Sequence, residues 1–248
     1  MRPLAAVDLD QTVLFTRHAS DGTLVEELAP GLDGLAEVAV LLPVTTRTVE
    51  QFARVGLHSE LAVCANGAVL LRDGAPDPDW ADWARQTCAA AAPLAEVAAH
   101  IGIDAEPPPW VHANRVAAEA FVYVVAHRRE DIPAGWLAEL GWWLAGRGWS
   151  LSVQGRKVYA VPAGLTKAAA VARVLAALGQ PVLLAAGDAL LDAELLAAAD
   201  AAIRPAHGEL HEQGWSCRGL HVTTASGPAA GAEIVAWLTD RALTPSTR

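Results

Sequence analysis

The chain has 248 residues, of which 53% are hydrophobic and 19% charged, and its formal net charge is −10. This composition is typical of a globular protein with one large domain or two smaller ones. The negative charge, without any block of lysines and arginines, argues against a nucleic-acid-binding or anionic-membrane-binding surface. No apolar run approaches the roughly 18 residues of a transmembrane helix. Asp8 and Asp10 interrupt the N-terminal apolar stretch too early for a signal peptide.

The three cysteines are widely spaced and include no CxxC pair; they are Cys64, Cys88 and Cys217. This usage predicts a reducing cytoplasm and argues against a zinc site. We therefore expect a cytoplasmic protein that acts on a small molecule, with neither nucleic acid nor membrane as a partner.

Strand-like and helix-like segments alternate along the first 71 residues, which predicts a mainly parallel sheet. An apolar strand at residues 4–7 comes first. A hairpin flap follows at residues 15–25, with Asp21-Gly22 as its turn. The next predicted segments are a helix at 32–37, a strand at 38–44, a helix at 49–55, a strand at 61–64 and an apolar segment at 68–71.

The middle of the chain differs in composition. Residues 73–79 are rich in Pro, Asp and Gly, which predicts a boundary, and seven of the nine tryptophans fall between Trp80 and Trp149. The predicted elements here are a helix at 79–100, a strand at 118–126, a helix at 136–145 and strands at 149–153 and 156–161. This order predicts an α+β domain over residues 72–161, inserted into a core domain made of residues 1–71 and 162–248.

The alternation then resumes. The predicted elements are a helix at 166–178, a strand at 181–186, a helix at 192–199, strands at 201–204 and 220–223, and a helix at 229–238. Only the tail after Leu243 is predicted to be disordered. The predicted fold class is α/β, with a Rossmann-like parallel sheet and an inserted α+β domain.

Polar side chains follow the predicted strands at three places: Asp8 with Asp10, Thr45 with Thr46, and Asp188. The carboxyl ends of parallel strands meet at one edge of a sheet, where ligands bind, so these side chains should converge. Asp8 and Asp10 project to the same side, and two crowded carboxylates favour a cation between them, for which Mg²⁺ is suited. An ordinary strand exit, capped by Asp and Thr, would give the same local pattern.

Two further residues extend this pattern. Asp192 lies four residues after Asp188, and Lys167 is one of only two lysines in the chain. Seen alone, Lys167 fits a solvated helix surface and Asp188 fits a helix N-cap. Together the residues fit phosphate monoester hydrolysis, in which one carboxylate accepts the phosphoryl group and a second carboxylic acid protonates the leaving oxygen. Mg²⁺, a lysine and hydroxyl or backbone donors would neutralise the transferring group.

The chain resembles the haloacid dehalogenase (HAD) superfamily of phosphohydrolases, whose four signature motifs occur here in order. They are Asp8-Leu-Asp10-Gln-Thr12 (DxDxT), Thr45-Thr46-Arg47 (TGR in one branch), Lys167 in Gly164-Leu-Thr-Lys-Ala, and Gly187-Asp188-Ala-Leu-Leu-Asp192 (GDxxxD). Asn66-Gly67 and the long insert resemble the branch with C2-type caps, which includes Cof-like, sucrose-phosphatase-like and mannosylglycerate-phosphatase-like enzymes. Gln11 and Thr46 depart from the family's usual glycines, and Leu191 stands where many relatives have Asn.

The resemblance implies a role for each matching residue. Asp8 would be the nucleophile and Asp10 the general acid/base, while Thr45 and Lys167 would hold the phosphoryl group. Mg²⁺ would be bound by Asp8, by Asp10 through its backbone carbonyl, by Asp188, and by Asp192, which would support the ion or orient Lys167. The residues expected to bind substrate are Thr12, Thr46, Arg47, Asn66 and Gly67.

The function predicted from these residues is Mg²⁺-dependent hydrolysis of a small phosphorylated metabolite, such as a sugar phosphate, by a monomer or homodimer. A phosphotransferase or phosphomutase on the same scaffold fits the sequence equally well. A non-catalytic binding protein with this fold is a third interpretation, against which the intact acidic motifs argue. His207, His211 and His221 lack a metal-binding spacing and are expected to be structural or exposed.

Overall fold

A computed structural model describes residues 2–179 and 182–244. The chain divides into two compact units, one formed by Met1–Asp77 with Lys167–Arg248 and the other by Pro78–Thr166. The proposed division into a core domain and an inserted domain at residues 72 and 161 remains a prediction. Within the described residues, no helix is both long enough and apolar enough to cross a membrane. The predicted disordered tail falls largely on residues 245–248, which lie outside the described part of the chain.

The first unit is built on a parallel sheet of five strands, in the order β14-β13-β12-β1-β4. These strands are β1 (Leu4–Val7), β4 (Val40–Pro43), β12 (Leu183–Ala186), β13 (Ala201–Arg204) and β14 (Leu220–Val222). Val7 is level with Pro43 on one side and with Ala186 on the other. The carboxyl ends of three neighbouring strands therefore meet at one edge, and the predicted α/β class with a parallel sheet is confirmed.

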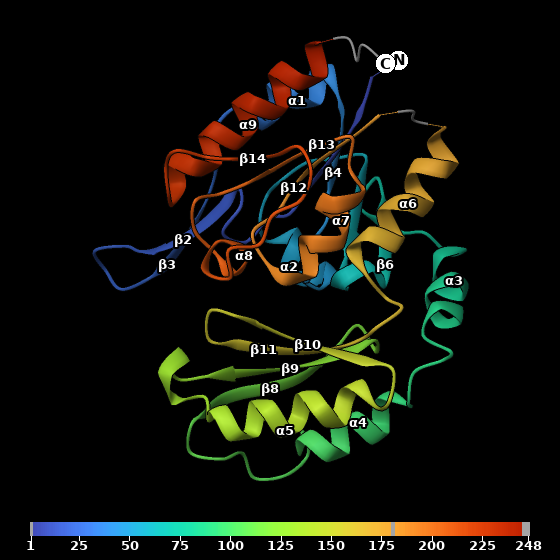
Figure 1. Cartoon of the computed structure of the whole chain (residues 1–248), viewed down its shortest axis with the longest axis vertical. Coiled ribbons are helices and arrows are strands. Elements are labelled where there is room, and N and C mark those ends of the chain that lie inside the picture. The colour runs from blue at the N-terminus through green and yellow to red at the C-terminus, as the bar shows by residue number, and fades with distance from the viewer. Residues whose placement is uncertain (1, 180–181, 245–248) are drawn as a thin grey trace. The chain divides into compact units, whose positions relative to one another are not determined.

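Helices cover both faces of this sheet (Figure 1). One face carries α1 (Leu32–Val38) and α9 (Pro228–Leu243), and the other carries α6 (Lys167–Leu178) and α7 (Ala193–Ala198). Because both faces are covered, β1 is apolar along its whole length and buried at every residue. The remaining elements of the unit are short: hairpin strands β2 (Leu14–His18) and β3 (Leu24–Leu28); strands β5 (Leu61–Cys64), β6 (Val69–Arg72) and β7 (Ala75–Pro76); helices α2 (Val49–Ala53) and α8 (Glu209–Glu212); and 3₁₀ turns η1 (Ala65–Gly67) and η3 (Leu190–Asp192).

The second unit is an antiparallel sheet with helices packed against it. Its strands run in the order β10-β11-β9-β8. Its elements are α3 (Trp80–Thr87), α4 (Leu94–Ile101), β8 (Val111–Ala117), β9 (Phe121–Ala126), η2 (Arg129–Asp131), α5 (Ala134–Ala145), β10 (Trp149–Gln154) and β11 (Lys157–Pro162). Val124 and Val158 belong to the buried cluster of this unit, against which the partly buried Trp110 and Trp136 pack.

Two sequence-based expectations in this unit were wrong in detail. The helix expected over residues 79–100 is interrupted, because the chain turns after α3 and Pro93 then precedes α4 as its N-cap residue. Strand β8 was not predicted, since His112, Asn114 and Arg115 give this edge strand a polar sequence. By contrast, the hairpin flap expected at residues 15–25 is confirmed as β2 paired with β3.

Candidate active site

The loop after β1 holds the first acidic motif in a tight turn. Leu9 is its centre, because its carbonyl accepts hydrogen bonds from the amides of three later residues, at 3.1, 3.0 and 2.8 Å. Asp8 is 5% exposed, and its backbone amide donates to Ala186 on the neighbouring strand at 2.9 Å. Gln11 adopts a left-handed conformation with φ of 65°, which is the conformation that favours glycine. Glycine would adopt this conformation without strain, whereas in this chain a glutamine adopts it.

The ring of His207 contacts this turn. The Nε2 atom of His207 lies 2.8 Å from the carbonyl oxygen of Gln11. The Gly227 amide donates to the Nδ1 atom of the same ring at 3.2 Å. Since Nδ1 accepts a hydrogen bond, Nε2 carries the hydrogen of the neutral ring and donates to Gln11. The expectation of a structural role for His207 fits these contacts.

Lys167 is a buried cation between two carboxylates. It is the first residue of α6, it is 1% exposed, and its Nζ lies 2.6 Å from both Asp8 Oδ1 and Asp192 Oδ1. Burial alone would lower the pKa of this ammonium group. The charges and hydrogen bonds of Asp192 and Asp8 outweigh burial and raise the pKa above its ordinary value. Lys167 is therefore a fixed positive charge at the edge of the sheet.

The loop after β12 is organised by Asp192. Its Oδ2 accepts hydrogen bonds from the amides of Asp188 and Ala189, at 3.2 and 3.0 Å. Gly187 lies so close that an added Cβ would sit 2.5 Å from the Cβ of Asp192. Both oxygens of the Asp192 carboxylate thus bind protein donors, one the ammonium group of Lys167 and the other two backbone amides.

Asp188 lies beside a second glycine. It is 7% exposed, and a Cβ at Gly208 would sit 2.5 Å from its Oδ2. Gly208 also has φ of 85°, so a side chain there would be both crowded and strained. The Thr12 hydroxyl lies 3.1 Å from Asp8 Oδ2 and 3.4 Å from Asp188 Oδ1, so it bridges the two loops.

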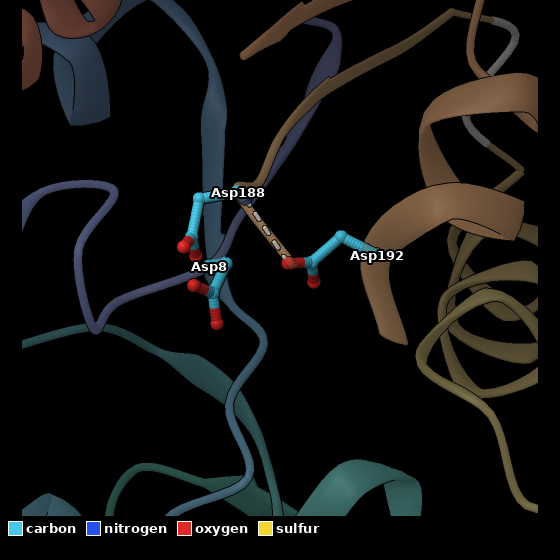
Figure 2. A group of neighbouring side chains, drawn as sticks. All are labelled: Asp8, Asp188 and Asp192. Atoms are coloured by element: carbon cyan, nitrogen blue, oxygen red, sulfur yellow. Dashed lines mark hydrogen bonds between the residues drawn. The ribbon is translucent and has the colours of Figure 1, made fainter. Parts of the chain in front are cut away.

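Three carboxylates meet in this cluster, each offering one oxygen within 4.8 Å of the others (Figure 2). Burial raises the pKa of Asp8 to about 7 although Lys167 opposes the shift, and the charges of Asp192 and Asp10 add to it. Burial, together with the charges of Asp8 and Asp192, raises the pKa of Asp188 well above its ordinary value. Among the described residues no cation pairs with Asp188.

The cluster has the chemistry of a divalent-cation site. When ionised, its three carboxylates carry −3 and the Lys167 ammonium carries +1, which leaves a net −2. Hard oxygen donors and a deficit of two positive charges are what Mg²⁺ requires. Asp8 and Asp188 are the better-placed ligands, because the Asp192 carboxylate is already held by Lys167 and two amides.

Asp10 lies outside this cluster and faces a different partner. Arg47 donates from Nε to Asp10 Oδ2 at 2.8 Å and from Nη2 to Asp10 Oδ1 at 2.7 Å. Arg47 also binds Glu26 of β3, at 2.7 and 3.0 Å. Glu26 received no role from the sequence, because nothing in the local pattern of an exposed hairpin indicates which charged residue faces a distant loop.

The loops after β4 and β5 contribute the remaining predicted residues. Thr45 is fully buried; its hydroxyl accepts a hydrogen bond from the Arg47 amide at 3.1 Å, and its carbonyl accepts one from the Asn66 amide at 2.9 Å. Asn66 and Gly67 form the turn η1 with positive φ values of 56° and 110°. Thr46 is half-buried, and within the described residues its side chain makes no hydrogen bond to the other predicted site residues.

Comparison with known proteins gives a result for structure only. No family model matches the chain, and no curated protein matches its sequence. Three similar solved structures cover nearly all of it. The sucrose-phosphatase of Synechocystis sp. PCC6803, in complex with sucrose and phosphate, has 18% identity and a TM-score of 0.66, with 96% of this chain and 98% of that chain covered. A trehalose-6-phosphate phosphatase related protein has 16% identity and a TM-score of 0.60, with 96% and 97% covered. The HAD subclass IIB sugar phosphatase BT4131 has 10% identity and a TM-score of 0.59, with 97% and 100% covered.

At these identities the comparisons establish the fold. The structural neighbours are HAD superfamily phosphatases, and this chain has their fold over nearly its full length. The resemblance expected from the four motifs is therefore confirmed at the level of structure.

Proposed function

We propose that this protein is a Mg²⁺-dependent phosphatase that hydrolyses a small phosphorylated metabolite through an aspartyl-phosphate on Asp8. One observation carries the proposal. Three buried carboxylates and one buried ammonium group converge at the carboxyl edge of a parallel sheet, with a net charge of −2. A phosphatase needs this combination of a carboxylate nucleophile, a fixed cation and a place for a divalent cation.

In the first chemical step, a carboxylate oxygen of Asp8 forms a bond to phosphorus while the bond from phosphorus to the leaving oxygen breaks. Asp10 donates its proton to that leaving oxygen, so that a neutral alcohol departs. In the second step, Asp10 takes a proton from a water molecule, which attacks phosphorus and releases phosphate and the Asp8 carboxylate. Lys167 stays protonated throughout because of its raised pKa, and it supplies positive charge beside Asp8.

Mg²⁺ would be held by Asp8 and Asp188, with the backbone carbonyl of Asp10, and would neutralise charge on the transferring phosphoryl group. We propose that Asp192 acts mainly by fixing Lys167 and the loop after β12, because both its oxygens accept hydrogen bonds from the protein.

We propose that the loops beside the carboxylates bind the substrate. Thr45 is buried at the end of β4, where its loop is tied to the Asn66 turn, and it would contact the phosphoryl group. The same contact with substrate is proposed for Thr12, Thr46, Arg47, Asn66 and Gly67. A sugar phosphate is the proposed substrate class, supported by neighbours that are described as a sucrose-phosphatase and a sugar phosphatase.

The test is phosphate release from a panel of phosphorylated metabolites, with Mg²⁺ or with EDTA, by the wild type and by Asp8→Asn. This substitution keeps the shape of the side chain and removes the nucleophilic carboxylate. We expect Mg²⁺-dependent release that disappears in the variant. Release that survives in Asp8→Asn would overturn Asp8 as the nucleophile. Transfer of phosphate to an added sugar would indicate a phosphotransferase or mutase, and no turnover of any compound would favour a binding role.

A further inference from the structure

Arg47 lies between two carboxylates that come from different loops. Its Nε and Nη2 atoms face Asp10, at 2.8 and 2.7 Å, and its Nη1 and Nη2 atoms face Glu26, at 3.0 and 2.7 Å. Each carboxylate therefore takes one edge of the planar guanidinium group, in the paired geometry that arginine forms best. The Arg47 side chain is 13% exposed, whereas Asp10 and Glu26 are 33% and 32% exposed.

The backbone of Arg47 is fixed as firmly as its side chain. Its amide donates to the Thr45 hydroxyl at 3.1 Å, and its carbonyl accepts a hydrogen bond from the Ala65 amide at 2.7 Å. Burial alone would lower the pKa of Arg47, but the hydrogen bonds and charges of Asp10 and Glu26 raise it, so the group remains a cation. The hairpin β2–β3 and the loops after β1 and β4 are thus joined through one guanidinium group.

We propose that Glu26 is a positioning residue for the phosphatase reaction: by holding the outer edge of Arg47, it fixes the inner edge against Asp10 and so aims the carboxyl group of Asp10. This inference rests on the proposed function, in which Asp10 passes a proton to the leaving oxygen. Proton transfer needs the two oxygens at hydrogen-bond distance, and a carboxyl group free to rotate spends much of its time misaligned.

Glu26 also prevents a competing interaction. A phosphoryl group carries the oxygen arrangement that arginine binds in pairs, so it could draw Arg47 away from Asp10. With Glu26 in place, four N–H···O contacts commit the guanidinium group to the two carboxylates. Arg47 then acts on the reaction through Asp10, and its fifth N–H group, on Nη1, is left for the contact with substrate proposed above.

The hairpin supplies a matched control at the next residue. Glu27 follows Glu26 in β3, and adjacent residues of a strand face opposite sides. Glu27 binds Arg17 of β2 at 2.6 Å, so its ion pair stays within the hairpin. Glu27→Ala therefore removes the same chemical group from the same strand without touching Arg47.

The experiment compares two substrates that differ in their need for a proton donor. An alkyl phosphate, the best sugar or glycerol phosphate of the panel, needs its leaving oxygen protonated, whereas p-nitrophenyl phosphate releases a stable anion. Because the later attack of water uses Asp10 for both substrates, the comparison is made on the first step alone, as the rate of leaving-group release in a single turnover with enzyme in excess. For Glu26→Ala we expect this rate on the alkyl phosphate to fall about 10- to 100-fold, since general acid catalysis contributes about 10²- to 10⁴-fold. On p-nitrophenyl phosphate the same rate should fall by less than about threefold. Glu26→Asp should recover part of the loss, and Glu27→Ala should match the wild type on both substrates.

Equal losses on the two substrates, or the same loss in Glu27→Ala, would overturn the proposal in favour of a purely structural role for the hairpin. Nitrogen-15 NMR of the Arg47 guanidinium group gives a second readout that does not depend on activity. We expect slow exchange of its Nε hydrogen in the wild type and faster exchange in Glu26→Ala. If the wild type turns over no substrate but shows slow exchange, the phosphatase assignment and the positioning role of Glu26 are both overturned, while the binding of Arg47 by Asp10 and Glu26 stands. If the wild type is active but its Arg47 Nε hydrogen exchanges fast, the positioning role of Glu26 is overturned and the phosphatase assignment stands.

Discussion

The negative charge of the buried Asp8 carboxylate should lower the free energy of unfolding, and the variant Asp8→Asn tests this directly. Burial raises the pKa of Asp8 from 3.8 to about 7. The folded protein therefore binds the proton of the Asp8 carboxyl group more tightly than the unfolded chain does. The stability that this proton gives the fold is fully present below pH 3.8 and is lost as the pH rises to about 7. The difference between the two pKa values corresponds to about 4 kcal/mol of unfolding free energy. Asparagine mimics the neutral form of the side chain at every pH.

The assay is urea unfolding of the wild type and Asp8→Asn in EDTA. Near pH 8 we expect the variant to be more stable by up to about 4 kcal/mol, and near pH 4 we expect the difference to fall below about 1 kcal/mol. Saturating Mg²⁺ should stabilise the wild type by about 3 kcal/mol at a hundred times its Kd, and should hardly affect the variant.

Asp21→Asn is the control, because hydrogen bonds from Thr23 lower the pKa of this exposed carboxyl group. It should gain no stability at either pH. If Asp8→Asn were less stable than the wild type near pH 8 without metal, the argument that the buried charge opposes folding would be refuted. The inactive variant would then owe its properties to disrupted packing.

Two further variants test the same cluster. Lys167→Met removes the ammonium group from beside Asp192, so the buried carboxylate of Asp192 loses its counterion. The variant should lose about 3–5 kcal/mol of unfolding free energy, measured in urea near pH 8. A cost below about 1 kcal/mol would contradict a structural ion pair. Gly208→Ala would place a Cβ 2.5 Å from Asp188 Oδ2 and should abolish Mg²⁺ binding in a calorimetric titration. Gly214→Ala, with φ of 63° and open space around it, is the control for backbone strain, and an equal loss of Mg²⁺ binding in this variant would show that strain alone is responsible.

The convergence of the acidic loops could be predicted from the sequence because two simple rules suffice. The apolar runs before Asp8 and Asp188 indicate buried parallel strands, and the carboxyl ends of parallel strands lie at one edge. The α/β class followed from the same alternation of segments. The roles assigned to these residues, by contrast, came from the resemblance of the motifs and remain predictions.

Other features depend on contacts between distant segments. The binding of Arg47 by Glu26 brings the hairpin β2–β3 into contact with the loop after β4, and no local sequence pattern indicates that these two segments meet. The left-handed turn at Gln11 could not be predicted either, since positive φ is uncommon for residues other than glycine. Strand β8 was missed because an edge strand carries too few apolar residues to show a period.

The position of Lys167 has a consequence for folding and synthesis. It is the first residue after the unit Pro78–Thr166, and its partner Asp8 lies 159 residues earlier in the chain. Closing so long a loop costs entropy, but a segment that has already folded between the two ends shortens the loop in effect. A nascent chain also lacks Asp188 and Asp192 until synthesis has passed Lys167 and the whole of α6. Chains that stop before Asp188 therefore never bring the four charges together, and these charges can meet only after the segments on both sides of the unit Pro78–Thr166 have been made.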